Sequence, residues 1–383
     1  MRPKRIYEIT DMIRFIIYTA IITLCSCGSK EVVERNDTFF TPDEYKIVSP
    51  CVDTTKMLTL EELPIEVLGA QGIAVKDSLL FVVTTDKTAY GSIVNLNTNK
   101  VVARVAPKGR GPSDFMYLDT DKQFWYNDKG ELIIATDDSD ALKPINITKS
   151  IKEQGSYIEY SKKFSDIYEF EYSFASRFIL DLGNDEYFIL QNTSYRDARE
   201  GKFFPPRYII KTKAEQYDFD IYKDVPTSQE DDMFAKRMSG RNVRIKPDRT
   251  KVVDVNGRVD YINIIDIESR KVLSVIEPNT PCFDEVGKMD MYATLKDGAI
   301  DVDVTDKYIL TLYDGRTMND VYNRKQKWAS LRLYDWDGNF IKAAQLPKIG
   351  VDYMAYDENS RTVYFIDRQI EKFYRCDLSE FMK

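Results

Sequence analysis

The chain has 383 residues, and its content of 43% hydrophobic, 13% aromatic and 30% charged residues is typical of a folded globular protein. Its 62 Asp and Glu residues outnumber 54 Lys and Arg residues, and the net charge of −8 argues against nucleic acid as a partner. The chain has no histidine, which excludes Ser-His-Asp triads, Cys-His pairs and metal sites with histidine ligands. Carboxylate, Lys and Tyr catalysis remains open, as do calcium sites made of oxygen ligands.

Residues 1–26 have the pattern of a lipoprotein signal peptide. Four basic residues, the last of them Arg14, precede the apolar run Phe15–Leu24. This run is about half as long as the roughly 20 residues that a helix needs to cross a bilayer. It leads into Leu24-Cys25-Ser26-Cys27, which resembles a bacterial lipobox and predicts lipidation of Cys27. A plain secretory signal peptide is the alternative, and Met12 offers a second start position.

Several acyl chains on Cys27 would make membrane anchoring effectively permanent. We therefore expect the membrane to be a partner through this lipid anchor, in the bacterial cell envelope, on an outer membrane facing the periplasm or the cell surface. Residues 27–56 are expected to be the lipidated cysteine and a polar tether. Cleavage after residue 26 removes four basic and two acidic residues, so the mature chain carries a net charge of −10.

Three further cysteines follow, Cys51, Cys282 and Cys376, so at most one disulfide can form among them. A ring-shaped fold would bring Cys51 and Cys376 close together. Three unpaired thiols, mostly buried, are the other interpretation, and the sequence leaves both open.

A unit of a polar turn followed by a strand rich in β-branched and aromatic residues recurs six times beyond the tether. The starts of these strands are 52, 55, 64, 57 and 55 residues apart. Each is followed by a second strand and, in most units, by a third. The six predicted strands are Leu79–Thr84, Glu131–Thr136, Glu186–Gln191, Thr250–Val255, Lys307–Tyr313 and Thr362–Asp367.

Three or four short antiparallel strands per period of about 50 residues predict an all-β, six-bladed β-propeller over residues 57–383. The last unit is one strand short. We expect the apolar stretch Leu58–Val67 to complete it, which would clasp the two ends of the chain together. A two-domain β-sandwich is the alternative, and it does not explain six repeats.

Several segments resemble known propellers. Gly109-Arg110-Gly111-Pro112-Ser113-Asp114-Phe115, followed by Asp128–Ile134, is similar to the interblade loop and first strands of six-bladed NHL-type and TolB-like propellers. Tyr313–Arg316 and Tyr334–Phe340 resemble the fifth blade of propeller lipoproteins common in gut Bacteroidetes. The resemblance covers about residues 57–383, and it implies a fold and a location more than a function.

The glycine-rich loop holds the first candidate ligand-binding residues, Lys108, Arg110 and Asp114. Glycines allow a ligand to approach the backbone, and the two cations suit a carboxylate, a sulfate or a sugar acid. Arg316, which follows a predicted strand, is the fourth candidate. Shaping of the turn, with Arg110 paired to a neighbouring carboxylate, is the alternative.

Calcium is the one cofactor that the sequence leaves open. The segments Asp137–Asp140 and Asp335–Asn339 are rich in side-chain oxygens that could bind calcium, but neither has the later acidic residue of a complete calcium loop. The second segment also fits a hairpin turn with Gly338 at a positive φ. Asp301-Val302-Asp303-Val304-Thr305 imitates a phosphatase nucleophile motif, but the repeat predicts a strand there instead. Two insertions, Thr227–Gly240 and Thr317–Trp328, are expected to contain short helices.

These observations favour a non-enzymatic binding or scaffold module for a peptide, glycan or partner protein. The alternative is a calcium- or carboxylate-dependent hydrolase or lyase with its site at the mouth of the propeller channel. A role in assembling an envelope complex, by analogy with TolB-like propellers, is a third hypothesis.

Overall fold

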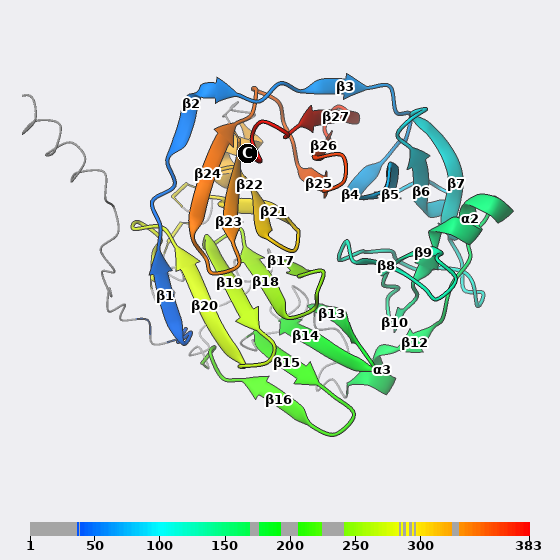
Figure 1. Cartoon of the computed structure of the whole chain (residues 1–383), viewed down its shortest axis with the longest axis horizontal. Coiled ribbons are helices and arrows are strands. Elements are labelled where there is room, and N and C mark those ends of the chain that lie inside the picture. The colour runs from blue at the N-terminus through cyan, green and yellow to red at the C-terminus, as the bar shows by residue number, and fades with distance from the viewer. Residues whose placement is uncertain are drawn as a thin grey trace, which may run out of the picture. The chain divides into compact units, whose positions relative to one another are not determined.

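The computed structural model describes residues 37, 39–168, 176–192, 206–223, 241–282, 285, 289–290, 293–294, 296–323 and 329–383. Six sheets follow one another around a ring (Figure 1). Within each sheet, which we call a blade, consecutive strands pair antiparallel and in chain order. The six repeats predicted from the sequence are therefore confirmed as the six blades of a propeller.

The first three blades contain eleven strands. Blade 1 consists of β4 (Ala70–Lys76), β5 (Leu79–Thr84), β6 (Ala89–Asn95) and β7 (Lys100–Pro107), blade 2 of β8 (Phe124–Tyr126), β9 (Leu132–Ile134) and β11 (Ile145–Asn146), and blade 3 of β13 (Ser176–Gly183), β14 (Glu186–Asn192), β15 (Arg207–Lys211) and β16 (Gln216–Phe219).

The last three blades also contain eleven strands within the repeats. Blade 4 consists of β17 (Arg241–Ile245), β18 (Lys251–Asn256), β19 (Tyr261–Asp266) and β20 (Lys271–Ile276), blade 5 of β21 (Ala299–Val304), β22 (Tyr308–Tyr313), β23 (Ser330–Asp335) and β24 (Phe340–Gln345), and blade 6 of β25 (Tyr353–Asp357), β26 (Thr362–Asp367) and β27 (Lys372–Asp377).

Three short helices and a two-stranded ribbon decorate the ring. They are α2 (Ile147–Glu153), α3 (Phe164–Ile167), α7 (Met318–Tyr322), and β10 (Ala141–Leu142) paired with β12 (Lys162–Lys163). Helix α7 begins at a capping box made by Thr317 and Asp320, within the second predicted insertion. The first insertion, Thr227–Gly240, lies outside the described residues. No helix among the described residues is long and apolar enough to span a membrane.

The hydrophobic core consists of separate clusters between neighbouring blades. Each cluster joins side chains of one blade to those of the next, and together they account for all six junctions of the ring. From blade 3 through blade 6 to blade 1, the first strands of neighbouring blades contact one another. This closure leaves few free sheet edges.

The sequence predictions coincide with the second strand of every blade. The predicted strands Leu79–Thr84 and Thr362–Asp367 match β5 and β26 at both ends. Apart from β21, the inner strands were not predicted, because polar residues interrupt their apolar pattern. Arg241 and Arg244, for example, both lie in β17.

The predicted clasp between the chain ends is confirmed. β3 (Glu61–Leu63), from the stretch Leu58–Val67, pairs antiparallel with β27 and becomes the fourth strand of blade 6. Two exposed ion pairs, Lys372 to Glu62 and Arg375 to Glu61, flank this junction.

The expected tether, residues 27–56, needs a correction. β1 (Glu44–Ile47) pairs parallel with β20, and β2 (Val52–Met57) pairs parallel with β24, so each adds a fifth, outermost strand to a blade. Figure 1 shows β1, β2 and β3 along the outside of the ring. The described residues from Asp37 onward belong to the same compact unit as the ring. Polar composition suggested a tether, but edge strands need only backbone hydrogen bonds to pair.

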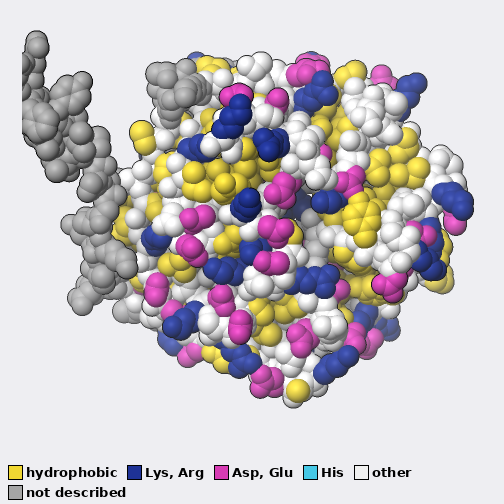
Figure 2. All heavy atoms as spheres, in the orientation of Figure 1, with side chains coloured by type: hydrophobic (Ala, Val, Ile, Leu, Met, Phe, Trp, Pro, Cys, Tyr) yellow, Lys and Arg dark blue, Asp and Glu magenta, His cyan; other side chains and the backbone are white. Residues whose placement is uncertain are grey.

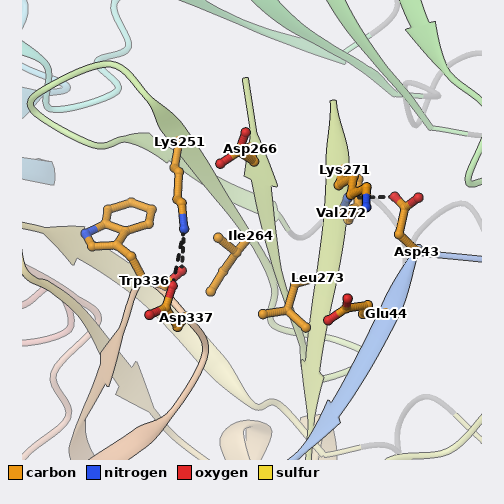
Figure 3. Close-up of a pocket in the computed structure, with 10 residues that line it drawn as sticks. All are labelled: Asp43, Glu44, Lys251, Ile264, Asp266, Lys271, Val272, Leu273, Trp336 and Asp337. Carbon is orange, nitrogen blue, oxygen red and sulfur yellow. Dashed lines mark hydrogen bonds and ion pairs between the residues drawn. The ribbon is translucent and has the colours of Figure 1, made fainter. Parts of the chain in front are cut away.

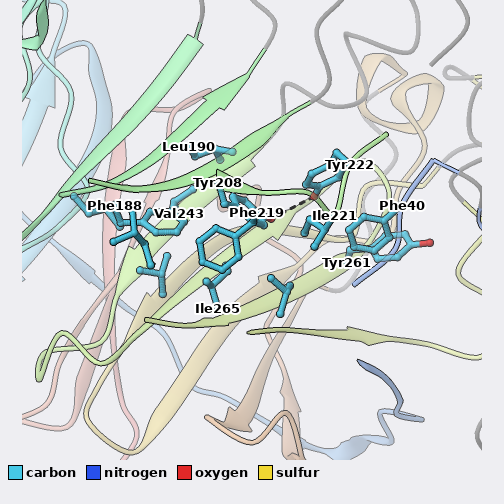
Figure 4. Packing of buried hydrophobic residues seen from close by; sticks show 14 of the residues in the cluster. Phe40, Phe188, Leu190, Tyr208, Phe219, Ile221, Tyr222, Val243, Tyr261 and Ile265 are labelled. Carbon is cyan, nitrogen blue, oxygen red and sulfur yellow. Dashed lines mark hydrogen bonds between the residues drawn. The ribbon is translucent and has the colours of Figure 1, made fainter. Parts of the chain in front are cut away.

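Phe40 fixes the beginning of this N-terminal arm. Its side chain is fully buried between blades 3 and 4, with its ring centroid 5.0 Å from that of Tyr222 and 5.1 Å from that of Tyr261 (Figure 4). Beside it, Arg241 donates hydrogen bonds to the Tyr208 and Tyr222 hydroxyls at 2.8 and 2.7 Å and pairs with Asp254. The hydrogen bonds among Arg241, Tyr208, Tyr222 and Asp254 are internal to the protein, so these residues stabilise the fold.

Cys51, Cys282 and Cys376 form no disulfide with one another. Cys376 is buried, and burial raises the pKa of its thiol to about 11. Cys51 is exposed and Cys282 is half-buried, so the expectation of mostly buried thiols is met by Cys376 alone.

Candidate functional site

Strand direction defines two ends of the ring. Asp301 and Asp303 of β21 accept hydrogen bonds from the backbone N–H groups of Met354 and Tyr356 of β25, each at 2.8 Å, so these neighbouring inner strands run in the same direction. Because adjacent strands within a blade are antiparallel, the residues before an inner strand lie at the same end as the loop between the second and third strands. We call this the interblade end, since the chain passes between blades there.

The glycine-rich loop lies at the interblade end, between blades 1 and 2. Asp114 folds back and accepts a hydrogen bond from the Gly111 N–H at 2.8 Å. A Cβ at Gly109 would lie 2.1 Å from the Asp114 carboxylate, so this close approach requires glycine. The Lys108 ammonium lies 4.2 Å from the centroid of the Tyr90 ring, and Arg110 is exposed. Asp114 thus shapes the loop, while Arg110 is open to solvent.

Arg316 lies at the same end, in the loop between β22 and β23. Its guanidinium donates to both oxygens of Asp314, at 2.7 and 2.8 Å. These hydrogen bonds raise the pKa of Arg316. The carboxylates that face it are Asp314, Asp352 and Asp297, not Asp114. Arg316 and the glycine-rich loop therefore share an end of the ring but belong to different charge clusters.

The segment that imitates a phosphatase motif is a strand, as predicted. Asp301 and Asp303 lie on β21 and face the backbone of β25. Their carboxylates accept hydrogen bonds from β25 backbone N–H groups, as the carbonyls of a neighbouring strand would. Burial raises the pKa of Asp303, and the charge of Lys122 and the hydrogen bond from the Tyr356 N–H partly offset this rise. These two carboxylates join blade 5 to blade 6.

Lys122 reaches across the ring axis. It precedes β8 in blade 2, and its ammonium donates to Asp301 at 2.8 Å and to the Met354 carbonyl at 2.6 Å, in blades 5 and 6. The side chain is 4% exposed. Its backbone φ of 58° lies in the left-handed region that lysine seldom adopts, so the surrounding contacts hold a strained residue here. Burial lowers the pKa of Lys122, an effect that Asp301 opposes.

Arg244 of β17 completes this bridge. Its guanidinium donates to Asp301 at 3.3 Å and to the Val243 carbonyl at 2.7 Å, while its Nε has no partner among the described residues. Two cations, Lys122 and Arg244, therefore face the two carboxylates of β21 on the ring axis.

Asp119 and Asp121 add two more carboxylates beside Arg244, toward the interblade end. Asp121 is 8% exposed, whereas Asp119 reaches solvent. Burial raises the pKa of Asp121 to about 7, with Arg244 opposing and Asp119 reinforcing the shift. Sequence reasoning missed both residues, since nothing in the pattern of residues 119–123 marks them. Their proximity to Arg244 arises from closure of the ring.

A separate cavity of about 240 Å³ lies between blade 4, β1 and the turn that joins β23 to β24 (Figure 3). Lys251 donates to the Trp336 carbonyl at 3.1 Å and faces Asp337, and Asp43 accepts from the Val272 N–H at 2.8 Å. These contacts fasten β1 and the turn to blade 4, so the polar lining supports the fold.

The two candidate calcium segments have internal partners. Asp138 accepts from Lys143 at 2.7 Å, and although burial alone would raise its pKa, this contact and three backbone N–H groups hold it below its ordinary value. Asp335 accepts from the Asp337 and Asn339 N–H groups, and Gly338 has a φ of 73°, as expected of a hairpin turn. Within the described part of the chain, no three His, Cys, Asp or Glu residues are grouped so as to hold a metal ion.

The charged side chains on the face seen in Figure 2 are of both signs. On the face seen in Figure 2, Lys and Arg side chains are interspersed with Asp and Glu, and the surface is hollowed near the centre. Neither sign dominates this face, so any selection by charge depends on local groups.

Comparison with known sequences identifies a family. The profile of the TolB-like 6-blade propeller-like family matches residues 70–358. No curated protein sequence matches the chain.

Solved structures that resemble this ring are distant in sequence. A protein from Bacteroides fragilis, described as exported, is 12% identical, with a TM-score of 0.47, over 87% of this chain and 98% of the other. A member of the DUF4221 family from Bacteroides vulgatus is 11% identical, with a TM-score of 0.48, over 84% and 96%. The Cps50 (Swd1) β-propeller domain of Myceliophteria thermophila is 11% identical, with a TM-score of 0.40, over 84% and 100%.

Proposed function

This chain belongs to the TolB-like 6-blade propeller-like family, and we propose that it is a lipid-anchored binding module of the bacterial envelope that holds a partner polypeptide at its interblade end. The fold does not specify a function, so the proposal depends on the surface at that end. The lipid anchor is the one expected at Cys27, which precedes the described residues.

The observation that carries this proposal is a group of exposed apolar side chains at the interblade end. We call it the interblade rim. Leu68 is 73% exposed, Met116 and Tyr117 are each 54% exposed, and Ile370 is 53% exposed. Met and aromatic residues are enriched in protein interfaces relative to other surface.

The rim residues come from three successive blades and are held in place. Leu68 and Ile370 each adjoin a contact between blades 1 and 6, in which Glu371 accepts a hydrogen bond from the Gly69 N–H at 3.0 Å. The backbone N–H groups of Met116 and Tyr117 both donate to Asp138, at 2.9 and 3.1 Å. A prearranged surface loses little conformational entropy on binding, which favours affinity.

Charge identifies the kind of partner. Tyr117 donates a hydrogen bond to Asp119 at 3.4 Å, so the rim adjoins the acidic pair Asp119 and Asp121. A polypeptide segment that combines apolar and basic side chains complements this surface in both respects.

The test compares rim variants with a matched control. Leu68→Ser and Ile370→Ser remove apolar surface from the rim, and Val101→Ser removes it from β7, where Val101 is 38% exposed at the outer edge of blade 1. Cross-linking in envelope fractions, followed by mass spectrometry, should identify a polypeptide that the wild-type chain and the control retain and the rim variants lose. Equal retention by all four proteins would refute the proposal, as would turnover of substrates in hydrolase or lyase screens.

A further inference from the structure

The segment before β8 contains side-chain acceptors that have no hydrogen-bond donor among the described residues. Neither oxygen of Asp121 accepts a hydrogen bond from any described residue, although the residue is 8% exposed. Two positions on, Gln123 is 7% exposed; its amide nitrogen donates to the Asp181 carbonyl at 2.8 Å, but its Oε1 has no partner among the described residues. Buried acceptors of this kind are costly unless a donor binds them.

The nearest cation does not supply that donor. Arg244 interacts with Asp121 through its charge, but its hydrogen bonds go to Asp301 and to the Val243 carbonyl. Lys122 is likewise directed to β21 and β25. The neighbouring cations are thus committed to the bridge across the ring axis.

The balance of charges at the ring axis favours a positively charged ligand. Lys122 and Arg244 balance Asp301 and Asp303, so deprotonation of Asp119 and Asp121 leaves an excess of negative charge beside them. Asp119 is exposed, so a ligand has access to the pair from solvent. The Tyr117 ring beside it, which is 54% exposed, offers an apolar and cation-binding face.

The number of ligands distinguishes an organic cation from a metal ion. Calcium takes six to eight oxygen ligands, and the described residues provide no group of three acidic, Cys or His side chains. An alkylammonium or a guanidinium group needs fewer partners and donates the hydrogen bonds that the carboxylates and the Gln123 amide oxygen lack.

We propose that Asp119 and Asp121, with the amide oxygen of Gln123, form a binding site for an alkylammonium or guanidinium group of the kind that Lys and Arg side chains carry. The site itself stands independently of the proposed function, whereas its assignment to a side chain of a bound polypeptide rests on that function.

The experiment titrates the purified full-length chain with tripeptides at pH 8, using calorimetry. The probes are acetyl-Gly-Lys-Gly-amide and its Arg, norleucine and Glu counterparts, with calcium chloride as a separate arm. The Lys or Arg peptide should bind, and the norleucine and Glu peptides should not. Asp121→Asn should weaken binding by about tenfold or more, as expected for loss of a charge-assisted contact. Asp128→Asn, which makes the same change in an exposed turn, should leave binding unchanged.

Four results would overturn the cation site: no binding of either basic peptide, equal binding of the norleucine peptide, stronger binding of the Glu peptide or of calcium, or equal affinity in Asp121→Asn. Asp119→Asn provides a second test at a position that reaches solvent. If the basic peptides bind but the rim variants retain their partner, the proposed function fails and the cation site stands. If the rim variants lose their partner but no basic peptide binds, the cation site fails and the proposed function stands.

Discussion

Replacement of Asp121 by asparagine should stabilise the protein, and the gain should grow with pH. The folded-state pKa of about 7 lies above the ordinary value of 3.8, so the folded chain holds a proton that the unfolded chain releases between about pH 4 and pH 7. Stability therefore falls as pH rises through this window, and the loss is complete above pH 7. At about 1.36 kcal/mol per pKa unit, the full loss amounts to about 4 kcal/mol.

Asparagine has nearly the same shape as aspartate but no charge, so the variant does not lose stability as pH rises through this window. Relative to the wild-type chain, Asp121→Asn should gain about 2 kcal/mol in free energy of unfolding at pH 5 and about 4 kcal/mol at pH 8. Urea unfolding followed by tryptophan fluorescence at both pH values measures the difference, with Asp128→Asn as the control. A gain that does not change between pH 5 and pH 8, or a variant less stable than the wild-type chain at pH 8, would refute the interpretation of Asp121 as a buried, unpaired carboxylate.

Three further predictions address the anchor, the arm and the axis. Cys27→Ala should move the protein from the membrane fraction to the soluble fraction, because the acyl chains are lost; a variant that still fractionates wholly with membranes would contradict lipidation. Phe40→Ala should lower the free energy of unfolding by about 3–5 kcal/mol, as for other buried aromatic residues, and a loss below about 1 kcal/mol would show that the arm is not part of the core. Lys122→Met should cost about 3–5 kcal/mol, since it breaks a buried ion pair; denaturant unfolding that matches the wild-type curve would show that the bridge across the axis contributes little.

The sequence by itself determined the repeat and hence the architecture. Strands such as Leu79–Thr84 and Thr362–Asp367 are short apolar runs between polar turns, and this pattern is local. Because six similar units that each leave an apolar face uncovered can bury those faces in a closed ring, periodicity predicted the propeller and the strand that completes blade 6. The apolar part of the fold was therefore predictable.

The later part of the predicted tether, which contains β1 and β2, was predicted wrongly from composition, since polarity does not exclude pairing at a sheet edge. β1 and β2 attach through backbone hydrogen bonds, which any residue except proline can donate. Phe40 contributes the apolar anchor, but a single aromatic residue in a polar segment carries no periodic signal.

The candidate site depended on tertiary structure. Lys122 and Asp301 are 179 positions apart, and Lys122 lies in the sequence as one charged residue among many. Polar residues on inner strands interrupt the apolar pattern that identifies strands, so the segments that line the axis were the hardest to predict. Only ring closure decides which of these charges meet. It pairs Lys122 and Arg244 with Asp301, and leaves Asp121 buried without a donor. Local sequence determines which strands form, whereas the electrostatics of the axis depend on distances between blades, which the sequence does not encode locally.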